Sequence, residues 1–148
     1  MQLYLLIYAV LTLITSFKFQ YQDYFYSIFS EKTKSSETAE KILTFFENKK
    51  NLFLKRNFTI LILSQTIDIP IHKVSYQINN ELYTNFYTLL AYHRILHAKQ
   101  LLLDKPNYKI EVIANECGFN STVTFAKYFK QFVNCSPTEF RSANGLKL

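Results

Sequence analysis

Two parts of the sequence share one pattern: a short apolar segment, a break of a few residues, and a longer segment with apolar residues at helical spacing. The first part covers residues 58–80 and the second covers residues 109–132. Between them, residues 86–102 form one long helical pattern after Asn85, a residue suited to capping a helix. This arrangement predicts an all-α fold with two helix-turn-helix subdomains joined by a long linking helix.

Gly118 lies at the break of the second unit and is one of only two glycines in the chain. The chain has to reverse direction there within three or four residues, and a left-handed backbone conformation at such a point strains any residue with a Cβ. We therefore predict that Gly118 forms the turn of the second unit. Asp68 stands at the corresponding break of the first unit, so the two units differ at their turns.

Each unit ends in a segment with one apolar and one polar face, which is typical of a helix that packs on a core and presents its other side. The predicted inward residues are Ile71, Val74 and Ile78 in the first unit and Phe125, Phe129 and Phe132 in the second. The predicted outward residues are His72, Ser75, Tyr76 and Asn79 in the first unit and Val123, Lys127, Lys130 and Gln131 in the second, with Thr124 at the edge. The chain therefore presents two exposed helix faces.

Local signals predict two further helices that flank the units. Ser36 is placed to cap a helix over residues 37–50, which begins with acidic side chains and ends with basic ones. Ser136 and Glu139 have the spacing of a capping box at the start of a last helix. Residues 144–148 are predicted to be a short tail.

Residues 1–17 form an apolar stretch without any charged residue. A helix of this length reaches about 26 Å, slightly short of the roughly 30 Å hydrocarbon core of a bilayer. We therefore predict an apolar helix over residues 1–19 that either spans the membrane or is buried against the protein, followed by a linker over residues 20–36. All basic residues follow the uncharged residues 1–17, so a span would leave the rest of the chain in the cytoplasm.

Composition and the distribution of reactive side chains argue against several functional classes. The net charge of +6 favours polyanionic partners such as nucleic acid or an anionic membrane surface. Cys117 and Cys135 have no second cysteine or histidine close by and are predicted to be small apolar side chains. His93 and His97 are four residues apart on one predicted helix, but no third metal ligand is near. We therefore expect no metal, no cofactor and no enzymatic activity.

Two motifs resemble those of a known family. Residues 113–141, IANECGFNSTVTFAKYFKQFVNCSPTEFR, contain C-G-F, a serine, a phenylalanine, F-K and a closing S-P-x-E-F-R. The linking helix contains the run R-[IL]-x-x-A-x-x-L-L from Arg94 to Leu102. With these motifs, residues 37–143 resemble the C-terminal DNA-binding domain of AraC-type transcriptional regulators. The apolar and polar segments before this domain are similar to the tail of membrane-bound members of that family.

The resemblance implies a sequence-specific transcriptional regulator whose partners are double-stranded DNA and RNA polymerase. It implies a cytoplasmic DNA-binding domain, with residues 1–19 as an inner-membrane anchor. The residues that would contact DNA are Thr122, Val123, Thr124, Lys127 and Lys130 in the second unit, and His72, Ser75 and Tyr76 in the first.

The sequence departs from the family pattern at several positions. Asp68 and Tyr83 stand where the pattern has glycines. His93 stands where an aromatic residue is more usual, and Leu61 and Ile62 occupy positions that are commonly acidic and exposed. Exposed apolar residues at those two positions would favour an alternative function. In that alternative the chain is a membrane-tethered protein-interaction module, or a regulator fragment, that no longer binds DNA.

Overall fold

Every regular element in residues 36–82 and 84–144, the part that this computed structural model describes, is an α-helix. These residues belong to one unit, which is described here by itself. The apolar helix predicted over residues 1–19 lies outside the described residues, as does nearly all of the predicted linker. In the described part, no helix combines the length and the apolar character needed to cross a bilayer.

The first group of helices contains α2 (Glu37–Asn48), α3 (Lys50–Phe53), α4 (Ile60–Ile67) and α5 (Ile71–Asn80). Ser36 caps α2 as predicted, because its hydroxyl accepts a hydrogen bond from the backbone N–H of Ala39. The helix predicted over residues 37–50 is too long, since the chain leaves the helical conformation at Lys49. This change of direction allows α3 to bury Phe53 in the core.

The inward face of α5 differs from the prediction at one residue. Val74 and Ile78 are buried, whereas Ile71 is 43% exposed. Ile71 lies in the first turn, and helical spacing assigns a residue to a face without placing a neighbouring helix opposite it. Thr122, at the first position of the corresponding helix in the second unit, is exposed as well.

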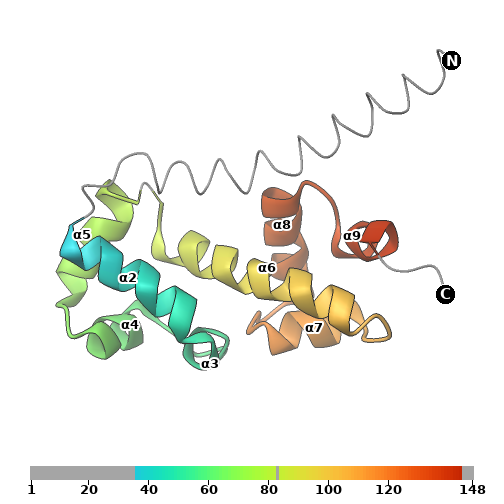
Figure 1. The fold of residues 1–148 in the computed structure, drawn as a ribbon, viewed down its shortest axis with the longest axis horizontal. Helices are drawn as coiled ribbons and strands as arrows, with labels where there is room; N and C mark the ends of the chain where they lie inside the picture. Colours follow the sequence, from blue (N-terminus) through green and yellow to red (C-terminus); the bar gives the residue numbers. More distant parts are fainter. Residues whose placement is uncertain (1–35, 83, 145–148) are drawn as a thin grey trace, which may run out of the picture. The chain divides into compact units, whose positions relative to one another are not determined.

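The linking helix α6 (Phe86–Asp104) is two residues longer than predicted and lies between the two groups of helices (Figure 1). Asn85 caps it, because its side-chain oxygen accepts a hydrogen bond from the N–H of Thr88 at 3.0 Å. Helix α5 packs on it from the first group, and three helices pack on it from the second. Its buried residues therefore lie along its whole length, from Phe86 to Leu102.

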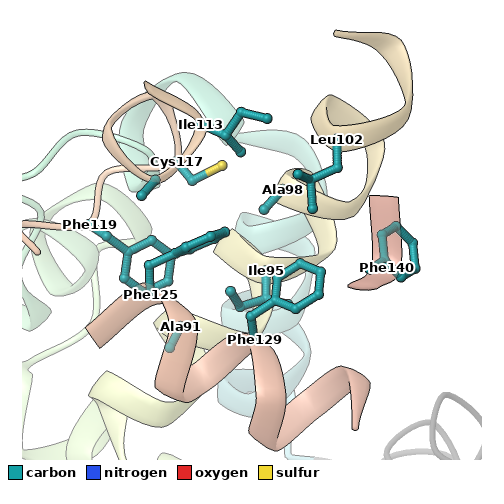
Figure 2. Close-up of a cluster of buried hydrophobic side chains, with 11 residues drawn as sticks. Ala91, Ile95, Ala98, Leu102, Ile113, Cys117, Phe119, Phe125, Phe129 and Phe140 are labelled. Carbon is teal, nitrogen blue, oxygen red and sulfur yellow. The ribbon is translucent and has the colours of Figure 1, made fainter. Parts of the chain in front are cut away.

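The second group consists of α7 (Ile110–Glu116), α8 (Thr122–Val133) and α9 (Pro137–Asn144). Figure 2 shows its core, in which Phe125 and Phe129 of α8 face residues of the linking helix. The capping box before α9 is confirmed: Ser136 N–H donates to Glu139 Oε2 at 2.7 Å, and Glu139 N–H donates to Ser136 Oγ at 3.2 Å. Local capping and a shared aromatic core thus hold these helices in place.

Candidate nucleic-acid interface

The turns of the two units have the same backbone conformation. Gly118 has a φ of 80° and Asp68 has a φ of 54°, so both lie in the left-handed region. In the second unit the N–H of Phe119 donates to the carbonyl of Ala114 at 3.0 Å, five residues back, and in the first unit Ile69 N–H donates to Ser64 O at 3.1 Å. Both turns therefore share this five-residue bond, although Asp68 N–H donates to Ser64 O whereas Gly118 N–H donates to Asn115 O.

The side chain of Ser64 gives the first turn an additional bond. Its hydroxyl donates to the carbonyl oxygen of Ile69 at 2.6 Å, across the turn. Ala114, the corresponding residue of the second unit, has no hydroxyl to make this bond. The extra hydrogen bond offsets part of the strain that a left-handed residue with a Cβ introduces at Asp68.

Helix α8 presents the residues that the sequence predicted to contact DNA. Its first turn is fixed by Ser121, whose hydroxyl accepts from the N–H of Thr124 at 3.1 Å and contacts the Thr124 hydroxyl at 3.2 Å. Val123 is 81% exposed, far more than is usual for a branched apolar side chain. All five predicted contact residues of this helix are exposed: Thr122, Val123, Thr124, Lys127 and Lys130.

Helix α5 presents a face of similar layout but different chemistry. His72 and Tyr76 are exposed, the latter to 61%, so two of the three predicted residues are accessible. Ser75 is half-buried, and its hydroxyl accepts a hydrogen bond from Asn79 Nδ2 at 3.5 Å. The structure thus places Ser75 at the edge of this face.

The two helices can be compared position by position, because each buries its fourth and eighth residues. Those residues are Val74 and Ile78 in α5, and Phe125 and Phe129 in α8. In this register Lys73 corresponds to Thr124, and it is exposed. Sequence reasoning missed Lys73 as a candidate, although counting from the helix start would have identified it.

A family model for a helix-turn-helix domain matches residues 63–143. The chain belongs to the AraC-type helix-turn-helix family. Members of this family are DNA-binding transcription regulators and not enzymes. No curated protein matches the chain significantly.

Solved structures with a similar fold include three AraC-type or related domains. The C-terminal domain of AraT, a response regulator from Geobacillus stearothermophilus, is 22% identical with a TM-score of 0.61, over 75% of this chain and 88% of that one. The C-terminal domain of the response regulator yesN from Fusobacterium nucleatum is 26% identical with a TM-score of 0.57, over 72% and 99%. The DNA-binding domain of AdpA, solved with a target DNA, is 23% identical with a TM-score of 0.57, over 74% and 93%.

The buried thiol of Cys117 in this AraC-type domain is not activated as a nucleophile. Burial raises the pKa of the Cys117 thiol to about 12, so the thiol stays protonated near neutral pH. Neither Cys117 nor Cys135 is in a disulfide. Across the described ranges, no group of three or more histidine, cysteine, aspartate or glutamate side chains is placed to hold a metal ion.

Proposed function

We propose that this chain is a sequence-specific DNA-binding transcriptional regulator that inserts α5 and α8 into successive major grooves. The observation that carries the proposal is the exposed face of α8. Val123 is 81% exposed there and lies between two exposed threonines, and two exposed lysines follow it. A valine side chain that stays exposed to water adds no hydrophobic stabilisation to the domain. If the helix enters a groove, the same side chain can lie against bases.

The side chains on α8 divide into two chemical roles. Lys127 and Lys130 carry the positive charge suited to phosphate oxygens, which fix the helix on the duplex. Val123 offers only apolar contact, and the group on a base edge that matches it is the thymine methyl. Neither α5 nor α8 contains an arginine, the residue that most often reads guanine. We therefore propose a preference for sites rich in A·T pairs.

Helix α5 would supply the contacts to a second half-site about one helical turn away. His72 and Tyr76 offer hydrogen-bonding groups, and Lys73 adds a positive charge to the same helix. Asn79 is exposed one turn further on, and an asparagine amide can bind adenine through two hydrogen bonds. The first unit therefore retains the side chains needed to read DNA.

The proposal is tested by titrating the full chain against random-sequence DNA and against sites selected from it, at several salt concentrations. Binding through phosphate contacts weakens steeply as salt rises, and a selected site should bind at least a hundredfold more tightly than random DNA. If binding is not saturable, or does not respond to salt, the proposal is wrong.

One observation favours a second candidate function. Leu61 on α4 is 52% exposed, while its neighbour Ile62 is half-buried. An exposed leucine on this helix suits a contact with another protein. The variant Leu61→Glu distinguishes the two functions. In a regulator that uses α5 and α8, it should leave DNA affinity unchanged. In an interaction module, it should abolish binding of the partner protein. Contact with RNA polymerase and anchoring through residues 1–19 stay predictions from the resemblance.

A further inference from the structure

Arg94 of the linking helix is the charged residue most deeply placed in this domain, with 7% of its surface exposed. Its Nε donates a hydrogen bond to the carbonyl oxygen of Phe53 at 2.9 Å, and its Nη2 donates to the carbonyl oxygen of Lys55 at 2.7 Å. Phe53 is the last residue of α3, and Lys55 lies in the segment that leads from α3 to α4. The guanidinium therefore binds the first group of helices at two points, just before the first unit begins.

The turn of the second unit reaches the same segment from another side. A Cβ on Gly118 would overlap the carbonyl oxygen of Leu54, would lie 2.9 Å from its carbonyl carbon, and would lie 3.1 Å from Cζ of Arg94. Cζ of Arg94 is also 5.8 Å from the ring centroid of Phe119, the residue after the turn. The backbone of residues 53–55, the Arg94 side chain and the Gly118 turn thus meet at one place.

We propose that Arg94, the Leu54 carbonyl and Gly118 form a joint that fixes the orientation of α5 relative to α8. Arg94 is then a positioning residue, which determines how many base pairs can separate the two half-sites. This inference rests on the proposed function, because half-sites exist only if both helices read DNA.

The geometry of the guanidinium explains why such a joint is stiff. Its planar fork points two N–H groups in fixed directions, so both carbonyl acceptors are held relative to α6. The bond to the Phe53 carbonyl is buried, so that carbonyl has no ready replacement if it loses its donor, and the rearrangement is costly. A lysine at this position has a single ammonium on a flexible stem and cannot hold both acceptors in the same plane.

The first experiment measures tolerance to half-site spacing in the full chain. One base pair is inserted between the half-sites of a selected site, which rotates them by about 34° and separates them by about 3.4 Å. Wild-type protein should lose at least about tenfold in affinity, whereas Arg94→Lys should lose less than about threefold. Arg56→Lys is the control, because it makes the same chemical change at an exposed position in the adjoining segment. Equal penalties in wild type and Arg94→Lys would overturn the joint.

A second experiment needs no DNA. Spin labels on cysteines introduced at Tyr76 and Val123, in a Cys117→Ala and Cys135→Ser background, report the distance between α5 and α8. We expect one narrow distribution with Arg94 and a broad one with Arg94→Lys, in samples whose helical content by circular dichroism is equal. Equally narrow distributions would show that Arg94 does not position the units. Failure of the wild type to bind DNA would instead refute the proposed function, and the distances would still decide whether the joint exists.

Discussion

The imidazole of His93 stacks on the ring of Phe46, with 4.4 Å between the centroids and an angle of 7° between the planes. The contact joins the linking helix to α2, and Phe53 lies near the same imidazole at 6.1 Å. His93 therefore occupies the aromatic position that the family resemblance indicated, as a partly buried flat ring stacked on the core residue Phe46. Burial lowers its pKa to about 4.

This stack predicts that acid destabilises the domain through His93. In the unfolded chain the pKa is near its ordinary value of 6.5, so the unfolded state takes up a proton first as the pH falls. The contribution of His93 to stability is complete above pH 6.5 and is lost between pH 6.5 and about 4. At pH 4.5 the loss should be roughly 2 to 3 kcal/mol.

Urea unfolding at pH 7.5 and pH 4.5 measures this loss in wild type and in His93→Phe. Carboxylates titrate in both proteins, so their effect cancels when the two pH dependences of unfolding free energy are subtracted. The remaining difference is the contribution of His93. His97 also has a pKa lowered by burial and remains in both proteins. If His93→Phe loses as much stability on acidification as wild type, the stacked imidazole is not the acid-sensitive group.

We predict that substitutions at the two turns change the free energy of unfolding by different amounts. Gly118→Ala adds a Cβ both to a left-handed residue and against the Leu54 carbonyl, so we expect a loss of more than about 2 kcal/mol in the free energy of unfolding. Asp68→Gly removes a Cβ from a left-handed residue, and the Ser64 hydroxyl still closes that turn. The free energy of unfolding should then change by less than about 1 kcal/mol.

Chemical denaturation of both variants checks this contrast. Ser64→Ala serves as the companion variant, because it removes the hydrogen bond to the Ile69 carbonyl and should cost about 1 kcal/mol. If Gly118→Ala lowers the free energy of unfolding by no more than Asp68→Gly changes it, the close approach of Gly118 to the Leu54 carbonyl does not contribute to stability.

Val123 is predicted to contact a thymine methyl group. Replacing the thymines of a selected site one at a time with deoxyuracil removes only the methyl, and one replacement should weaken wild-type binding about fourfold. Val123→Ala should bind the unmodified site more weakly and show no further loss at that thymine. His72→Ala, altered in the other unit, should keep the wild-type sensitivity there. Identical uracil profiles for Val123→Ala and wild type would contradict the contact.

Lys127 is predicted to bind DNA through a phosphate. Lys127→Ala should weaken binding to selected and random sites alike and reduce the slope of log affinity against log salt by about one. Lys41→Ala is the matched control, since Lys41 is exposed on α2 and pairs with exposed Glu37 at 2.7 Å. The same change of slope in both variants would mean that overall charge, and not the position on α8, determines the effect.

Most helix boundaries could be predicted because the interactions that set them are local. Ser36, Asn85 and Ser121 each bond to an N–H three residues ahead, which is a spacing visible in the sequence. The left-handed turn at Gly118 follows from the same kind of reasoning. The end of α2 and the exposure of Ile71 could not be predicted, because both depend on which other helices lie nearby.

By itself the sequence determined the helix caps, the turn at Gly118 and most residues of the outward faces, since these follow from hydrogen bonds and side-chain spacing within a few residues. Only the tertiary structure decided what Arg94 and Gly118 contact. The carbonyls bound by Arg94 lie 41 and 39 positions away in the chain, and Leu54 is more remote still from Gly118. The packing of the helices around α6 determines these partners. A buried guanidinium needs hydrogen-bond acceptors, and the Leu54 carbonyl fits only against a residue without a Cβ.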